Sequence, residues 1–211
     1  MMDKETVDQH VLALVAMKDV DEERMPDNSV KGKTWLQKIM YIASKSHGDK
    51  RFGFKPYKYG MYSPTLEESV TRCSQNGLIC VHHPNGDGAI HITDKGKERL
   101  DPDKCDDRML LQMQSIKSLL NGLDYHQMIV YSYALFPEMA EHSEIAGDFE
   151  SWRVDEATAM YLKGSVSFAL AATISGLGRD GFENHVRNGG MEPYSSLVHT
   201  KVITPMKRPE F

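Results

Sequence analysis

The chain has 211 residues, enough for one large domain or two small ones, and its 40% hydrophobic and 26% charged residues are ordinary for a soluble globular protein. No stretch is apolar for long enough to span a membrane. The formal net charge of −5 excludes attraction of DNA by the charge of the whole molecule, so a DNA-binding surface requires a local cluster of Lys and Arg.

The cysteines and the first residues indicate the compartment. Cys73, Cys80 and Cys105 are three in number and fit no disulfide framework, which is typical of a reducing environment. The first residues contain no apolar segment of an export signal. We therefore expect a cytoplasmic protein that is not inserted in a membrane.

Apolar spacing and turn residues predict a series of helices and strands in the first hundred residues. Ser63 and Pro64 are placed as an N-cap and a first-turn proline, and Gly77 is placed to end that helix in a left-handed conformation. Thr93 can cap the following helix. The expected elements are helices at Lys4–Asp19, Val30–Ser44, Thr65–Asn76 and Asp94–Leu100, an extended segment at Phe52–Tyr62, and hairpin strands at Leu78–His83 and Ala89–Thr93.

The order of these elements is informative about function. From Leu36 to Gly96 the chain runs through a helix, an extended segment, a helix, a hairpin and a helix start. This is the order of a winged helix-turn-helix, a fold used mainly to bind nucleic acid or protein partners.

The second half of the chain is expected to be helical. Predicted helices lie at Asp106–Leu120, Asp124–Leu135, Asp155–Lys163, Ser167–Ser175 and Arg179–Asn188. The expected fold class is therefore mainly α with a small antiparallel β-hairpin. We expect a winged-helix domain at 1–100, a helical connector at 101–150, a helix-turn-helix unit at 151–190 and an extended or disordered tail at 191–211.

The predicted helix before the hairpin is an acidic candidate for reading DNA. In a winged helix this element is usually the recognition helix. Here it carries Glu67 and Glu68 near its start and Arg72 as its single basic residue, whereas major-groove readers normally begin with Arg, Lys, Asn or Gln. Arg72 is the DNA-contact candidate on this helix.

A basic and aromatic strip precedes that helix and has two interpretations. It interleaves Lys50, Arg51, Lys55 and Lys58 with Phe52, Phe54, Tyr57 and Tyr59. Such a strip can bind phosphates and stack on bases. Alternatively, the aromatic side chains pack the extended segment onto the helices while the lysines are solvated, and this second interpretation is favoured. Lys55 and Lys58 remain candidates for DNA contact.

The C-terminal helix pair is a better candidate for reading bases. Ala171 and Ala172 permit close approach of helices, and Phe182 anchors the last helix. Between them, the glycine-containing segment Gly176–Gly178 allows a tight turn. The exposed face of that helix is then mildly basic and rich in amides. Its candidate DNA contacts are Arg179, Asn184, His185 and Arg187, with Asn188 beside them.

The predicted hairpin also carries Cys80, His82, His83 and His91. If Gly86 and Asp87 form the turn, His91 lies opposite His82, an arrangement that suits a metal ion or a pH sensor. Histidines are common on an exposed wing, so we expect no metal site. No nucleophile elbow, phosphate loop or Cys-x-x-Cys motif is present, and we expect neither an enzyme nor a cofactor.

Two segments resemble known families. Leu36-x-Lys38-x-x-Tyr41, Tyr59-Gly60-Met61-Tyr62-Ser63 and Gly77-Leu78-Ile79 resemble the Panacea family and related uncharacterised prokaryotic winged-helix proteins, over about residues 33–100. Panacea proteins usually have Tyr-Gly-Pro where this chain has Tyr59-Gly60-Met61. Gly164, Ser165, Ala171-Ala172, Gly176-Leu177 and Phe182, within about residues 157–190, resemble small prokaryotic helix-turn-helix proteins often encoded beside toxin genes.

The resemblances imply what the chain does. For Panacea-like proteins the implied role is to bind and neutralise a partner protein, and for the second family it is control of transcription. We therefore expect a dimeric, DNA-binding transcriptional regulator of antitoxin type. The alternative is a protein-binding antitoxin that neutralises a cognate toxin without touching DNA, and the net charge of −5 favours this alternative.

Overall fold

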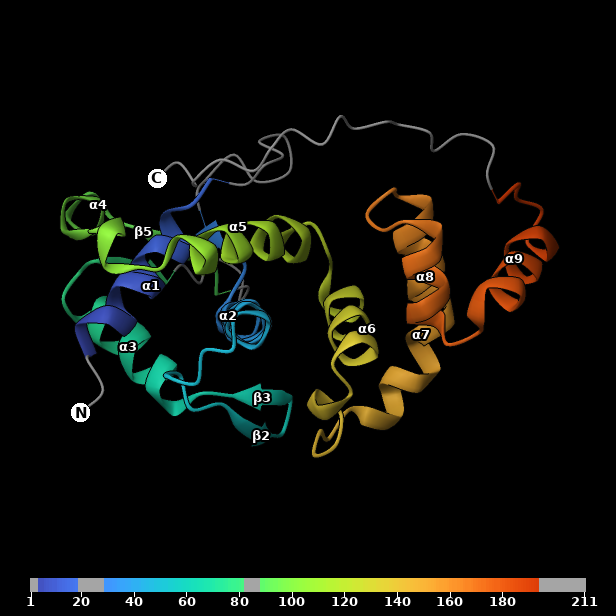
Figure 1. Ribbon diagram of the computed structural model, residues 1–211, viewed down its shortest axis with the longest axis horizontal. Coiled ribbons are helices and arrows are strands. Elements are labelled where there is room, and N and C mark those ends of the chain that lie inside the picture. The colour runs from blue at the N-terminus through green and yellow to red at the C-terminus, as the bar shows by residue number, and fades with distance from the viewer. Residues whose placement is uncertain (1–3, 19–28, 82–87, 194–211) are drawn as a thin grey trace. The chain divides into compact units, whose positions relative to one another are not determined.

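The computed structural model describes residues 4–18, 29–81 and 88–193, and within them it contains nine α-helices and a small amount of antiparallel β-structure (Figure 1). The expected fold class, mainly α with a small antiparallel hairpin, is confirmed at this level. The described residues form two compact units, unit 1 at 4–18, 29–55, 61–81 and 88–122 and unit 2 at 56–60 and 123–193. The boundaries at 100, 150 and 190 that the sequence suggests remain predictions. No described helix has the length and apolar character needed to cross a membrane.

Unit 1 contains five helices and the sheet. Its helices are α1 (Lys4–Ala16), α2 (Lys33–His47), α3 (Pro64–Gln75), α4 (Asp94–Arg99) and α5 (Asp107–Asn121). Its strands are β1 (Ser29–Val30), β4 (Ile79–Val81) and β5 (Ile90–Ile92), in the order β1-β5-β4 with antiparallel pairing throughout. β2 (Lys55–Tyr57) and β3 (Gly60–Tyr62) form a separate two-stranded ladder, and residues 56–60 at its tip belong to unit 2.

The predicted helix caps are confirmed. Ser63 Oγ accepts the backbone N–H of Leu66 at 3.0 Å, and Thr93 Oγ1 accepts that of Gly96 at 3.0 Å. Gly77 follows α3 with φ of +66°, the left-handed conformation in which a residue with a side chain is strained. These signals lie within a few residues of one another in the sequence, which is why the sequence alone predicts them.

Two expectations for the sheet are wrong. Val30 is a strand residue paired with Ile90 and not the start of a helix, because Gly32 caps α2, which begins at Lys33. His91 lies opposite Cys80 and not opposite His82. At the open end of this hairpin, next to α3, the Thr93 N–H and hydroxyl both donate to the carbonyl of Leu78, which agrees with this register.

A buried lysine joins α5 to the end of α1. Lys117 is fully buried, and its ammonium donates to the carbonyl oxygen of Met17 at 2.5 Å and to that of Val15 at 3.4 Å. The last carbonyls of a helix have no partner within the helix, and the negative end of the helix dipole attracts a cation. Lys117 therefore satisfies α1 from a helix one hundred residues later in the chain.

The end of α5 also holds the start of α2. Asn121 Nδ2 donates to the carbonyl of Ser29 at 2.9 Å, and Trp35 Nε1 donates to the carbonyl of Leu120 at 3.0 Å. β1 and α2 are thus bonded to one end of α5, which also packs along α2.

Two buried polar groups of α2 have different roles. Gln37 exchanges hydrogen bonds with the backbone of Ser63, at 2.9 Å from Ser63 N and 3.2 Å to Ser63 O, and so connects α2 to the N-cap of α3. Lys38, from the Panacea-like motif, is almost fully buried, and burial lowers the pKa of its ammonium to about 7.

Unit 2 contains four helices, α6 (Tyr125–Leu135), α7 (Ala146–Leu162), α8 (Phe168–Ser175) and α9 (Gly178–Asn188). Asp124 and Gln127 form a reciprocal capping box at the start of α6. α7 begins at Ala146, well before the predicted start at Asp155. Gly147 and the charged residues around it dilute the apolar spacing there, although Phe149 in this first part is buried.

We predict that Lys117→Met lowers the free energy of unfolding by about 2–3 kcal/mol, because the carbonyls of Val15 and Met17 stay buried without this donor. Urea unfolding followed by circular dichroism measures the change. Lys104→Met is the matched control, since Lys104 is an exposed partner of Glu5 and its loss is expected to have a much smaller effect. Equal effects of the two substitutions would contradict the anchoring role of Lys117.

Candidate functional site

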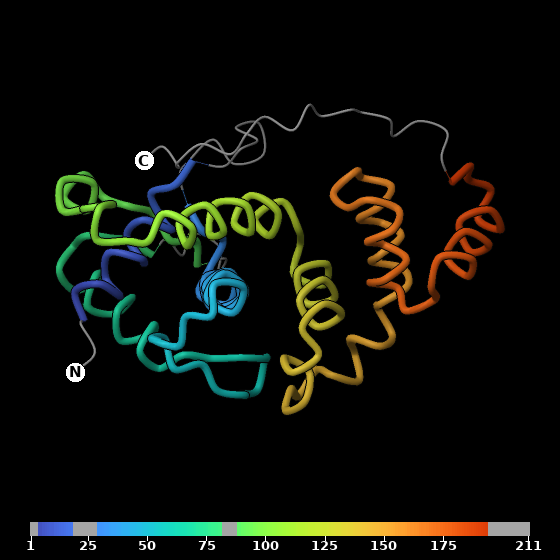
Figure 2. The backbone as a smooth tube through the Cα atoms, viewed as in Figure 1, coloured from blue at the N-terminus to red at the C-terminus, as the bar shows by residue number. Residues whose placement is uncertain are grey.

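The α8–α9 pair consists of two short helices joined by a tight turn. Ser167 Oγ caps α8 by accepting the backbone N–H of Leu170 at 3.2 Å. Gly176 ends α8 with φ of +74°, and Leu177 alone separates it from α9, so the chain reverses into the next helix without a loop (Figure 2). The Gly176 turn was predicted from the sequence, and the structure confirms it.

A small apolar cluster fixes α9 against α8. Phe182 and Val186 of α9 are fully buried, as are Ala171 and Ile174 of α8. The Phe182 ring lies 5.3 Å from that of Phe168, measured between centroids. Because one side of α9 is held in this way, its opposite side is directed to solvent.

Arg153 of α7 holds the turn itself. Its Nε donates to the carbonyl of Ile174 at 2.5 Å and one terminal nitrogen donates to that of Thr173 at 3.4 Å, so the guanidinium satisfies the last carbonyls of α8. It also fills the space beside Gly176, where an added Cβ would lie 2.8 Å from Arg153 Cζ. Sequence reasoning missed Arg153, since it is more than twenty residues from the turn and no spacing rule links the two.

The predicted DNA contacts on α9 share one helix. Arg179, Asn184, Arg187 and Asn188 are exposed, whereas His185 is half-buried with its ring stacked near Phe182 at 6.4 Å. Arg187 is held by Glu183, one turn before it, at 2.9 Å. Asp180 and Glu183 offset the charges of the two arginines, so the face offers directed donors with little net charge.

α3 offers less to DNA. Arg72 is bound by both carboxylate oxygens of Asp8, at 2.9 Å from Nε and 2.6 Å from a terminal nitrogen. Glu67 is paired with Lys33 at 2.5 Å, and Glu68 is exposed. The cation that sequence analysis placed on this helix is therefore committed to α1.

The aromatic residues of the basic and aromatic strip lie in two different environments. Phe52 is fully buried, and the Phe54 ring packs edge-on against Tyr41 at 5.2 Å, as the packing interpretation requires. Tyr57 and Tyr59 are 52% and 51% exposed and do not fit that interpretation.

Lys55 and Lys58, the two candidates for DNA contact in the strip, lie on the hairpin β2–β3. Lys55 is exposed on β2. Lys58 pairs with Glu144 at 3.0 Å, and this carboxylate raises the pKa of Lys58. The Lys58 carbonyl also accepts the backbone N–H of Glu144 at 2.8 Å, which attaches the hairpin tip to unit 2.

The β4–β5 hairpin brings Cys80 and His91 together as cross-strand partners. His82 and His83 lie outside the described residues. Within the described ranges 4–18, 29–81 and 88–193, no three His, Cys, Asp or Glu side chains are grouped to hold a metal ion.

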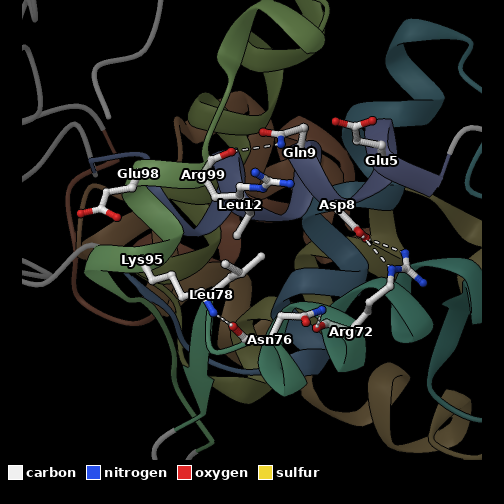
Figure 3. Close-up of a pocket in the computed structure, with 10 residues that line it drawn as sticks. All are labelled: Glu5, Asp8, Gln9, Leu12, Arg72, Asn76, Leu78, Lys95, Glu98 and Arg99. Carbon is white, nitrogen blue, oxygen red and sulfur yellow. Dashed lines mark hydrogen bonds and ion pairs between the residues drawn. The ribbon is translucent and has the colours of Figure 1, made fainter.

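A hollow of about 670 Å³ lies in unit 1 between α1, α3 and α4 (Figure 3). Arg72 points to Asp8 on one side, and Lys95 on the other side donates to the Asn76 carbonyl at 2.9 Å. Gln9 bridges the chain after α4, because its amide bonds the carbonyl of Arg99 and the N–H of Asp101. These polar groups thus join three helices to one another.

No family model, curated protein or solved structure matches the chain. The resemblances to Panacea and to the toxin-associated helix-turn-helix proteins therefore stay predictions.

We predict that Gly176→Ala lowers the free energy of unfolding by about 2 kcal/mol, because the new Cβ is strained at φ of +74° and displaces the Arg153 guanidinium. Gly147→Ala is the control, since nothing lies within 4 Å of a Cβ at that position in α7, and we expect a gain of about 0.5 kcal/mol. Thermal unfolding of both variants measures the effects. A neutral Gly176→Ala would show that the turn relaxes without cost.

Proposed function

We propose that this protein is a DNA-binding transcriptional regulator of antitoxin type, and that α9 is its base-reading helix. The observation that carries the proposal is the α8–α9 pair, in which a left-handed Gly176 joins two short helices and Arg179, Asn184 and Arg187 of the second helix are exposed. Arginine and asparagine are the side chains that pair with guanine and adenine in the major groove.

The choice of α9 over α3 follows from charge. The Arg72 guanidinium already donates two hydrogen bonds to Asp8 on a neighbouring helix, so contact between Arg72 and DNA would require breaking a bidentate ion pair. Arg187 is held by Glu183 on its own helix, in a pair between an exposed arginine and a half-buried glutamate that solvent screens. Redirecting Arg187 to a phosphate or a base therefore costs less.

The winged-helix interpretation of unit 1 is part of this proposal. It is supported by the element order α1-β1-α2-β2-β3-α3-β4-β5 and by the sheet order β1-β5-β4, in which the strand before α2 pairs with the second strand of the β4–β5 hairpin. We propose that unit 1 acts as the dimer-forming or partner-binding part, so that paired α9 helices read symmetric half-sites.

We predict sub-micromolar binding to the chain's own promoter, with an affinity that falls steeply with salt because Lys and Arg replace counterions. Arg179→Ala with Arg187→Ala is expected to weaken binding by about 30-fold, equivalent to about 2 kcal/mol, since two directed contacts are lost. Glu183→Gln is expected to tighten binding, because it removes a repulsive carboxylate and releases Arg187. Fluorescence anisotropy over a salt series measures all three.

Lys4→Ala with Arg108→Ala is the matched control, because it removes two exposed cations from unit 1. It is expected to change the affinity for DNA by less than about threefold, equivalent to about 0.6 kcal/mol, through the loss of general charge. Absence of binding to promoter DNA at low salt would contradict the proposal. Equal losses in the control and α9 variants would assign the binding to general charge and not to α9.

A second function, binding of a partner protein without DNA contact, is favoured by the exposed tyrosines of the hairpin tip and by the acidic surface of α3. Tyr57 and Tyr59 expose about half of their surface, and tyrosine is enriched at protein interfaces. Glu68 is exposed on α3 while the single arginine of that helix is committed to Asp8.

We predict that, if this second function holds, the chain co-purifies with the product of its neighbouring gene, and Glu68→Lys weakens the complex by about tenfold through reversed charge. Glu141→Lys, an equally exposed reversal in unit 2, is the control and is expected to leave the complex intact. Co-expression followed by size-exclusion chromatography measures the outcome. Co-purification that resists Glu68→Lys would move the interface away from α3.

A further inference from the structure

The hollow between α1, α3 and α4 (Figure 3) has the size of a small-molecule site. It measures about 670 Å³, and ligand sites typically enclose 300–1,000 Å³ with a few polar groups at defined positions. Its aliphatic lining comes from Leu12 of α1 and from Leu78, which precedes β4. Arg99, the last residue of α4, lines it as well.

The Arg99 guanidinium is directed into this hollow. Figure 3 shows the side chain extending from α4 toward α1, on the side of Leu12. The Arg99 carbonyl accepts the Gln9 side-chain amide at 3.2 Å, which fixes the backbone of this arginine beside α1. Among the residues that the structure describes, none makes a hydrogen bond or an ion pair with the guanidinium itself. Its five N–H donors therefore remain for a ligand.

Asp8, which lines the hollow from α1, is already bound by other donors. Its carboxylate accepts Arg72 Nε at 2.9 Å and a terminal nitrogen of the same guanidinium at 2.6 Å. The Ser69 hydroxyl donates a third hydrogen bond to it at 2.5 Å. Because these donors compensate the charge of Asp8, this carboxylate does not take Arg99 from a ligand.

The other charged residues of the lining leave an excess of positive charge in the hollow. Glu5 is paired with Lys104, and Glu98 points away from the hollow in Figure 3. The ammonium of Lys95 is bonded to the backbone carbonyl that ends α3, at 2.9 Å, and this neutral group does not cancel its charge. An anion in the hollow is therefore attracted by Lys95 but receives its hydrogen bonds from Arg99.

We propose that this hollow binds a small aliphatic carboxylate. The Arg99 guanidinium holds the carboxylate through two parallel N–H···O bonds, and the aliphatic chain lies against Leu12 and Leu78. A monoanion fits better than a phosphate dianion, because the carboxylates around the hollow repel a second negative charge. The proposal does not depend on DNA binding, since it involves no residue of α9.

The test uses the full chain labelled with ¹³C at the leucine methyl groups, with the Leu78 signals assigned by Leu78→Ile. Sodium hexanoate is the probe, hexanamide is its uncharged analogue and sodium acetate is its short analogue. We expect hexanoate to shift the Leu78 signals saturably, and each analogue to bind about tenfold more weakly.

Substitutions of Arg99 separate the role of the guanidinium from that of its charge. We expect Arg99→Gln to weaken hexanoate about tenfold while leaving hexanamide unchanged. Arg99→Lys keeps the charge but loses the planar fork, and we expect it to weaken hexanoate about threefold. Arg108→Gln is the matched control, because Arg108 is an exposed arginine of unit 1 outside the hollow, and it is expected to leave hexanoate binding unchanged.

Absence of a saturable Leu78 shift overturns the proposal. Equal affinity for hexanoate and hexanamide, or equal affinity of the Arg99→Gln and Arg108→Gln variants for hexanoate, overturns the role of Arg99. Undiminished binding by Arg99→Lys overturns the two-bond geometry, and equal affinity for hexanoate and acetate overturns the aliphatic contact. Failure of promoter binding leaves each of these results unaffected, so the two proposals fail separately.

Discussion

Unit 1 depends on one buried charge at the end of a helix. The ammonium of Lys117 occupies the place where α1 runs out of internal hydrogen-bond partners, and it comes from the middle of α5. This single interaction brings the first and last helices of unit 1 together. The C-terminal end of α5 also bonds Ser29 and Trp35, so β1 and α2 are held by α5 as well. β1, held in this way, pairs with β5 at the edge of the sheet.

The sequence predicts the parts of the fold that depend on neighbouring residues. Ser63, Thr93 and Ser167 are caps whose partners lie three residues away, and apolar spacing locates the helices they begin. The start of α7 was misplaced because its first turns are polar, and β1 was missed because two residues carry no periodicity. Strands this short exist through their pairing, which a local pattern does not contain.

The candidate site shows the same limit. The α8–α9 turn was predicted because Gly176 and the small residues before it are a local signal, whereas the guanidinium that fixes the turn comes from α7. Likewise, the sequence offers Arg72 and Lys58 as cations for DNA, but Asp8 and Glu144 bind them from distant positions in the chain. A charge counted in a sequence is less available to a ligand when a carboxylate from a distant part of the chain binds it in the fold.

The hydroxyl of Ser63 connects two segments of unit 1. It accepts the N–H that begins α3 and also donates to the carbonyl of Phe52, while Gln37 fixes the same residue from α2. Phe52 is fully buried, and its ring lies 6.1 Å from that of Phe54. One oxygen atom therefore connects the first turn of α3 to the loop that follows α2, so the start of that helix and the position of Phe52 are coupled through a single side chain.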